Sequence, residues 1–192
     1  MVRFHGRVPG TTVALITGDS DDVAAAVLGD RVGVGFVEGP KPPRGLSTSP
    51  VGRDELTVIV HPGHPWARRG SGITPAELAA TPLVSREHGS GTRQFLEQAL
   101  RAHTGALLAP PLLALSSTTA VRTAVAEAVA PGVLSSLAVS SELRAGPLAA
   151  VPVTGLDLTR TLRVVHRAGT QLVGAAAGLA AVARTAGRDA RR

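Results

Sequence analysis

Cysteine and tyrosine are absent from this sequence of 192 residues, which holds one tryptophan and three phenylalanines. Without cysteine the chain can form no disulfide framework, thiolate zinc site, iron–sulfur cluster or cysteine nucleophile. Aromatic residues make up 2% of the chain, too few for the stacking platforms of a protein that reads single-stranded nucleic acid. The hydrophobic core must therefore be built from alanine, valine and leucine.

Long hydrophobic runs are missing as well. No run reaches the ~18 apolar residues of a membrane-spanning helix, and residues 1–10 contain no apolar core of a secretion signal. We therefore expect a cytoplasmic protein that does not contact a membrane. With 44% hydrophobic and 18% charged residues the composition is that of a globular chain, and its length suits one domain or two small lobes.

Positive charge is in excess only near the end of the chain. The formal net charge is +6, and residues 160–192 contain seven arginines and one acidic residue. The remainder has 13 basic and 13 acidic residues and is neutral. We interpret the excess as a solvated helix face followed by a basic tail, and not as a nucleic-acid-binding surface.

Short runs rich in β-branched residues alternate with segments of helical periodicity, which predicts an α/β fold with parallel strands. The clearest local signal is a capping box, with Thr74 at the N-cap, Pro75 at the first helical position and Glu77 three residues after the cap. We expect strands at 11–17, 31–37, 55–60, 82–85, 112–115, 133–134, 148–153 and 161–166. We expect helices at 20–28, from 74, at 90–103, 118–128, 136–144 and 170–184, and a loop at 38–50.

Ligands of open α/β sheets bind where strands end and helices begin. The richest such junction is residues 85–93, SREHGSGTR. There Ser90, Gly91 and Thr92 open a helix whose unbonded N–H groups and positive dipole end favour an anion or a carboxylate, with Ser85 and Arg86 beside them. An ordinary N-cap and turn would use the same residues, so this segment alone leaves both interpretations open.

Three further junctions follow from the same rule. Residues 116–119 are four consecutive hydroxyl residues before a helix, more than one cap needs, so Ser117 and Thr118 are candidate ligand contacts. The other two junctions lie at Ser20 and at Glu38. Each of these could equally be a cap or a turn.

Patterns for catalysis and metal binding are weak. The residues around Ser90 do not form the five-residue nucleophile elbow of hydrolases, and the acidic residues form no convincing acid–base pair. His61 and His64 stand in a proline-rich turn with no third metal ligand close in sequence. The residues therefore indicate a binding site with no catalytic residue, no metal and no cofactor.

Several strings together resemble the effector-binding domain of LysR-type transcriptional regulators. They are VGVGFVEGP, GRDELTVIVHPGHPWA, ITPAELAATPLVSREHGSGTRQFLEQAL, TAVRTAVAEAVAPGVLSSLAVSSELRAGPLAAVPV and TRTLRVVHR, in that order. The resemblance implies a type-2 periplasmic-binding-protein-like α/β fold, with two Rossmann-like lobes around a cleft. Lobe I would hold residues 1–55 with 156–192, and lobe II would hold residues 56–155 with hinge strands at both ends.

The resemblance also implies a function. In such regulators a small metabolite, often an anion or a carboxylate, binds between the lobes and alters how a homodimer or higher homo-oligomer presents its DNA-binding heads. Carried over by position, the ligand-binding residues here would be Ser85, Arg86, Ser90, Gly91, Thr92, Ser117 and Thr118, with Glu38 and Ser20 from the opposite lobe.

This sequence departs from the family pattern in three places. The winged helix-turn-helix and its linker helix are missing, so we expect DNA to be contacted only through a head that is absent from this chain. The first strand and helix of the effector domain are missing too, which predicts an incomplete lobe I whose unpaired backbone invites exchange with another chain. Ala128 stands where the family has glycine, which puts the local turn in doubt.

Two other functions remain open from the sequence. A solute-binding protein of a transporter would share the fold, but it would need a secretion signal or a lipid-anchor cysteine. A small enzyme acting on a carboxylated substrate would need a nucleophile or base near Ser90, where His88 is the only candidate.

Overall fold

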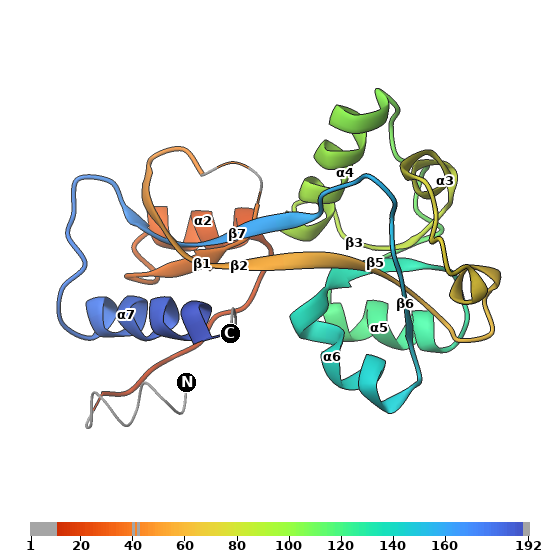
Figure 1. Cartoon of the computed structure of the whole chain (residues 1–192). Coiled ribbons are helices and arrows are strands. Elements are labelled where there is room, and N and C mark those ends of the chain that lie inside the picture. The colour runs from red at the N-terminus through yellow and green to blue at the C-terminus, as the bar shows by residue number, and fades with distance from the viewer. Residues whose placement is uncertain (1–10, 40, 42, 190–192) are drawn as a thin grey trace. The chain divides into compact units, whose positions relative to one another are not determined.

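The computed structural model describes residues 11–39, 41 and 43–189, and the chain divides into two compact units (Figure 1). Unit 1 consists of Met1–Arg53 and Thr161–Arg192, and unit 2 consists of Asp54–Arg160. The chain passes from one unit to the other along strand β2 (Leu46–Val60) and returns along strand β7 (Thr159–Arg167).

Unit 2 is built on a mixed β-sheet with the strand order β2-β5-β3-β4. Strand β3 (Val84–Arg86) runs parallel to β5 (Gly132–Ser135) and to β4 (Leu113–Leu115). Strand β2 runs antiparallel to β5 and to β6 (Ala149–Val151). The expectation of parallel strands therefore holds for β3, β4 and β5 and is wrong for β2 and β6.

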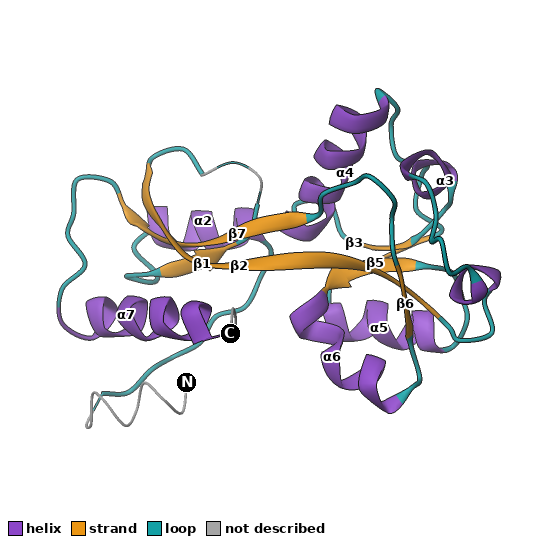
Figure 2. Cartoon of the chain, viewed as in Figure 1, coloured by secondary structure: helices purple, strands orange, loops and turns teal. Residues whose placement is uncertain are grey.

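Helices cover both faces of this sheet (Figure 2). The short helix η1 (Pro65–Arg68), α3 (Pro75–Ala80) and α4 (Gly91–Thr104) belong to one face, and α5 (Thr118–Ala126) and α6 (Ser136–Ala145) belong to the other. On β2, Val58 and Val60 are buried in the first core and Ile59 in the second. This alternation is expected for a strand that is buried on both faces.

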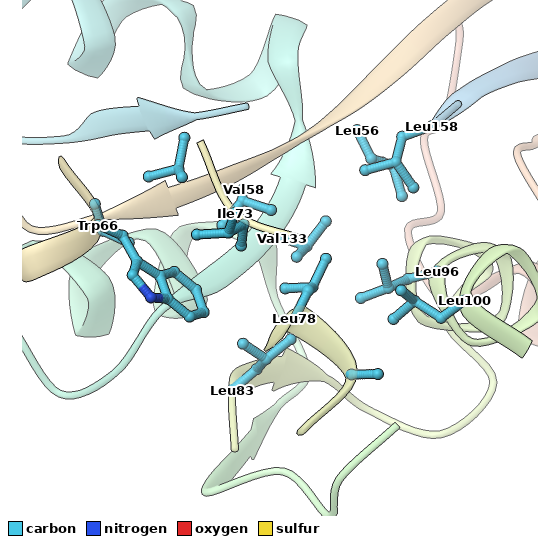
Figure 3. Packing of buried hydrophobic residues seen from close by; sticks show 13 residues of the cluster. Leu56, Val58, Trp66, Ile73, Leu78, Leu83, Leu96, Leu100, Val133 and Leu158 are labelled. Atoms are coloured by element: carbon cyan, nitrogen blue, oxygen red, sulfur yellow. The ribbon is translucent and has the colours of Figure 1, made fainter. Parts of the chain in front are cut away.

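The first of these cores is almost wholly aliphatic, as the composition predicted. Leucine and valine side chains of β2, α3 and α4 form it together with Ile73, and the single tryptophan, Trp66 of η1, lies at one side (Figure 3). Leu78 and Leu100 are completely buried there. Such a core holds α4 against the sheet, and α4 begins at the junction that the sequence selected as a ligand site.

Unit 1 has helices on both faces of a smaller set of strands. Strand β1 (Gly35–Val37) pairs antiparallel with β7, with Phe36 opposite Val164. On β7, Val165 packs with residues of α2 (Ser20–Leu28), while Val164 packs with Ala180 of α7 (Gly174–Asp189). Because Val164 and Val165 are adjacent on a strand, the two helices cover opposite faces.

The strand predicted at residues 11–17 is wrong. These residues have no regular secondary structure, and the side chain of Leu15 is 73% exposed. A β-branched run becomes a strand only when a neighbouring strand accepts its backbone hydrogen bonds. No strand pairs with residues 11–17 in the described part of the chain.

Strand β2 is longer than predicted, because it begins at Leu46 inside the segment that we expected to be a loop. Pro50 and the serines around it hid this strand from the sequence pattern. Proline lacks a backbone N–H and is tolerated in a strand where that group would face solvent, and Pro50 is exposed.

Helix starts agree with the local signals. Asp19 caps α2 by accepting hydrogen bonds from the N–H groups of Asp21 and Asp22. In α3, Thr74 Oγ1 accepts from the Glu77 N–H at 3.1 Å, and the Glu77 carboxylate accepts from the Thr74 N–H at 2.9 Å. The predicted capping box is confirmed.

The end of α5 contains the turn that the sequence put in doubt. Ala128 adopts a left-handed conformation with φ of 59°. Its N–H donates to the Val125 carbonyl at 3.0 Å, and the Val129 N–H donates to the Ala124 carbonyl at 3.1 Å. These are the paired bonds of a Schellman motif, a position that favours glycine because glycine has no Cβ.

Replacement of Ala128 by glycine is expected to raise the free energy of unfolding by about 0.5–1 kcal/mol. The left-handed conformation costs a residue with a Cβ about 1–2 kcal/mol, and the freedom that glycine adds to the unfolded chain offsets part of that gain. Urea unfolding of the Ala128→Gly variant measures the change. A variant no more stable than the parent would show that this φ carries no strain.

Among the described residues, no helix combines the length and the apolar character that crossing a membrane requires. Residues 1–10, where we expected no secretion signal, lie outside the described part of the chain.

Candidate ligand-binding site

The N-terminus of α4 is the centre of the candidate site. Strand β3 ends at Arg86, Gly89 turns the chain with φ of 98°, and Ser90 occupies the N-cap. The Ser90 side chain does not cap the helix: its Oγ is buried and has no hydrogen-bond partner, and the residue is 1% exposed. The first N–H groups of a helix have no intrahelical acceptors, so this end presents donors and a positive partial charge without a side-chain cap.

Thr92, in the first turn of α4, belongs to a buried network of four side chains. Arg160 donates to Thr92 Oγ1 at 2.9 Å and makes two hydrogen bonds to Asp54 Oδ2, at 2.9 and 2.7 Å. Ser135 Oγ donates to Asp54 Oδ1 at 2.8 Å. The Arg160 and Asp54 side chains are 5% and 2% exposed, so this is a charge pair inside the protein.

This network joins four elements at one point. Asp54 and Arg160 are the first and last residues of unit 2, on β2 and β7. Thr92 lies at the start of α4, and Ser135 is the N-cap of α6, where its side chain makes no capping bond. The ion pair therefore ties both strands that leave unit 2 to the beginnings of two helices.

The sequence analysis missed Asp54, Arg160 and Ser135. The two charged residues are 106 positions apart and their pairing has no local signature. The one usable signal is that each is a charged residue shortly before an apolar run of its strand, in GRDELTVIV and TRTLRVV.

Arg86 and Thr118, both predicted contacts, are brought together. Arg86 donates to Thr118 Oγ1 at 3.0 Å, at the start of α5, and it forms two hydrogen bonds to the carboxylate of Glu87, at 2.8 and 2.7 Å. These bonds from Arg86 lower the pKa of the Glu87 carboxyl. The positive charge of Arg86 is thus already matched by a neighbouring carboxylate.

The charges around the site balance one another. Arg93 pairs with Glu97 at 2.7 Å on α4, and Arg160 pairs with Asp54. Recognition of an anion here would depend on backbone N–H groups, hydroxyls and the helix dipole more than on net charge. The described residues around α4 offer donors for binding and no paired acid and base for catalysis.

The remaining predicted residues divide between the two units. Ser85 is buried on β3, next to Ala114 of β4. Ser117 caps α5 by accepting from the Ala120 N–H at 3.1 Å, which agrees with the ordinary interpretation of that junction. Ser20 and Glu38 belong to unit 1, where the Ser20 hydroxyl is buried without a partner and Glu38 is partly buried.

The histidine pair is a structural turn. His61 Nδ1 accepts from the Gly63 N–H at 3.0 Å, and His64 Nδ1 accepts from the Trp66 N–H at 3.1 Å. Burial, and then the nearby Arg69, lower the pKa of His64, which favours the neutral ring that can accept this bond. In the described residues no group of three or more potential ligands could hold a metal ion.

A family model and curated transcriptional regulators match this chain. A model described as the LysR substrate binding domain matches residues 1–188. An HTH-type transcriptional regulator of Mycobacterium tuberculosis (strain ATCC 25618 / H37Rv) is 45% identical over 170 residues, which are 88% of this chain and 54% of that protein. The HTH-type transcriptional regulator YeiE of Escherichia coli (strain K12) is 35% identical over 168 residues, 87% of this chain and 56% of that protein.

Among solved structures, the regulatory domain of Synechocystis PCC6803 CcmR in complex with 2-PG resembles this chain with a TM-score of 0.84. The identity is 23%, and the match covers 98% of this chain and 89% of that one. At this identity the likeness concerns the fold. This chain spans about half the length of the curated relatives it matches.

Proposed function

The chain belongs to the LysR substrate-binding domain family, and from this premise we propose that it binds a small anionic metabolite at the N-terminus of α4. The family consists of transcriptional regulators and not enzymes, and its domain is a type-2 periplasmic-binding-protein-like α/β fold. The predicted fold class and the effector-binding role are thereby confirmed. The interpretations as an enzyme or a transporter's solute-binding protein are set aside.

One observation carries the assignment of the site. The buried hydroxyl of Ser90 bonds to nothing at the end of a helix whose first N–H groups lack intrahelical partners. A buried polar group without a partner costs about 1–3 kcal/mol, so each such group in a native structure needs an explanation, and a bound ligand is one. A carboxylate or phosphate bound to these N–H groups would accept the hydrogen bond of Ser90 as well.

The site is supported by its neighbours. Thr92 is held in place by Arg160, and Thr118 by Arg86, so two of the predicted hydroxyl residues are positioned by buried or partly buried arginines. Fixed donors lose little conformational freedom when a ligand binds. Participation of Ser20 and Glu38 in the same site stays a prediction.

For the whole protein we propose the role of a cytoplasmic regulator that acts as a homodimer or higher homo-oligomer. DNA would be contacted by a helix-turn-helix head outside these 192 residues, as the names of the relatives indicate. Ligand binding changes the regulator only through different affinities for two arrangements of the protein.

A ligand screen followed by the Ser90→Ala variant tests the site. We expect a small carboxylated or phosphorylated acid, 2-PG among the candidates, to stabilise the protein and so raise its unfolding temperature. At a ligand concentration of 100 times the Kd, the free energy of unfolding should rise by about 2.7 kcal/mol. The Ser90→Ala variant should bind it about tenfold more weakly or worse, since a hydrogen bond to a charged group contributes about 1.5–3 kcal/mol. Calorimetric titration measures the affinity.

Unfolding of Ser90→Ala without ligand shows whether the substitution also changes the stability of the fold. Ser90 Oγ makes no hydrogen bond in the ligand-free protein. Its removal should therefore leave the free energy of unfolding without ligand unchanged or slightly higher. Ser141→Ala on the exposed part of α6, where the hydroxyl donates to Glu142 at 2.7 Å, should leave affinity unchanged. Equal affinity in Ser90→Ala and the parent would exclude this site.

A further inference from the structure

We propose that unit 1 carries a separate anion-binding site that takes a small polyanion with two or more phosphate or carboxylate groups. The site, called here the arginine groove, is a cavity of about 640 Å³ lined by Pro50, Val51, Gly52, Arg53, Thr161, Arg163 and Arg184. All of these residues belong to unit 1, whereas the N-terminus of α4 belongs to unit 2. The inference therefore does not depend on the proposed effector site.

The arginine groove is lined by positively charged side chains that form no ion pair with a carboxylate in the described chain. Among the residues that the structure describes, the lining contains three arginines and one threonine hydroxyl, and no acidic residue. Arg163 donates to two backbone carbonyl oxygens, those of Gly39 at 3.3 Å and Thr161 at 3.2 Å. These bonds orient its guanidinium group and leave its charge unmatched.

Some arginines of the described chain are paired with a carboxylate, and others, Arg31, Arg44 and Arg68 among them, are not. Arginines 69, 86, 93, 122, 160 and 167 each form an ion pair with a carboxylate at 2.5 to 2.7 Å. Within the described residues, Arg53, Arg163 and Arg184 form none. Three like charges around one cavity repel each other, and a bound anion of matching charge removes that repulsion.

Close backbone contact fixes the wall that carries Arg184. A Cβ atom added at Gly187 of α7 would lie 2.1 Å from the Val51 carbonyl oxygen, so helix and strand touch there backbone to backbone. Arg184 is three residues earlier on the same helix, and Val51 and Gly52 also line the groove. The position of Arg184 relative to Arg53 is thus set by packing and not by a mobile loop.

The chemistry of the lining selects the ligand class. Guanidinium groups bind phosphate and carboxylate through paired, parallel hydrogen bonds, and the Thr161 hydroxyl adds a neutral donor. A volume of about 640 Å³ accommodates a small molecule. A singly charged ion would match one of the three arginines, so the groove favours a ligand with several anionic groups.

Pyrophosphate and citrate are suitable probes, titrated calorimetrically into the chain at constant ionic strength. We expect both to bind, and we expect Arg53→Gln and Arg184→Gln each to weaken binding about tenfold or more. Arg44→Gln is the matched control, because Arg44 is an exposed arginine of unit 1 that does not line the groove. That variant should bind the probes like the parent.

Each other outcome overturns the proposal. No binding of either probe would show that the groove is not an anion site. Equal weakening in Arg44→Gln and Arg184→Gln would show a general effect of net charge. Weakening by Ser90→Ala alone would place the probe at α4, and binding of duplex DNA through Arg184 without binding of either probe would make the groove a nucleic-acid contact.

Discussion

Replacement of Asp54 by alanine is expected to lower the free energy of unfolding by about 3–5 kcal/mol, the usual cost of removing one member of a buried ion pair. Arg160 would lose both hydrogen bonds to Asp54 Oδ2 while its side chain stays 5% exposed. Ser135 would lose its acceptor as well. Urea unfolding of the variant and the parent measures the difference.

An exposed ion pair provides the control for Asp54. Asp30 accepts from Arg167 at 2.5 Å, but its side chain is 72% exposed, and solvated pairs contribute about 0–1 kcal/mol. Asp30→Ala should therefore change stability by at most about a third of the Asp54→Ala effect. If the two variants lose the same stability, burial is not what makes the Asp54–Arg160 pair important.

The double variant Asp54→Ala/Arg160→Met tests whether the unpaired charge causes the loss. Removal of both charges leaves no buried ion, so the double variant is expected to be more stable than Asp54→Ala alone. It should still bind the effector more weakly, because Thr92 would lose the hydrogen bond from Arg160 that orients its hydroxyl.

The second large effect is expected at Gly72. Its φ is +75°, and a Cβ atom there would lie 2.2 Å from the Pro152 carbonyl oxygen. The same oxygen accepts a hydrogen bond from the Ile73 N–H at 3.0 Å, and the Ile73 side chain is 1% exposed in the first core. Gly72→Ala must therefore displace the segment that anchors Ile73. We expect a loss of about 2–5 kcal/mol from backbone strain and overpacking together.

Gly70 is the matched control for Gly72, because a Cβ atom built there has no neighbour within 4 Å. Gly70→Ala should leave the unfolding midpoint unchanged or raise it slightly, since alanine restricts the unfolded chain. Thermal and urea unfolding of both variants would compare the sites directly. Equal behaviour of the two variants would contradict the proposed clash with Pro152.

Helix starts that depend on residues close together in the sequence were predicted correctly. The start of α3 needs only Thr74, Pro75 and Glu77, and the start of α2 needs only residues three positions apart. Residues 11–17 are richer in β-branched residues than β1, yet they remain irregular because a strand also needs a partner. Pairing is a property of the whole sheet, and no window of sequence contains it.

In the candidate site too, the local sequence predicts the position of the junction but not the hydrogen bonds of its side chains. The junction after β3 could be located because a glycine-rich turn before a helix is a local pattern. The hydrogen bonds of its side chains could not be predicted. Ser90 Oγ has no partner, Arg86 donates to Glu87 and Thr118, and Ser117 caps α5. Which hydroxyl stays available depends on neighbours that come from other elements.

The sequence by itself determined the family, the α/β class and the helix caps, and it located the junction that we propose as the ligand site, because each is encoded in contiguous residues. The tertiary structure alone decided that Asp54 meets Arg160 across 106 positions, that three arginines of β2, β7 and α7 line one cavity, and that residues 11–17 form no strand. The physical reason is distance along the chain: local hydrogen bonds and φ preferences act within a few residues, whereas charge pairing, burial and strand partners arise only when remote segments fold against each other.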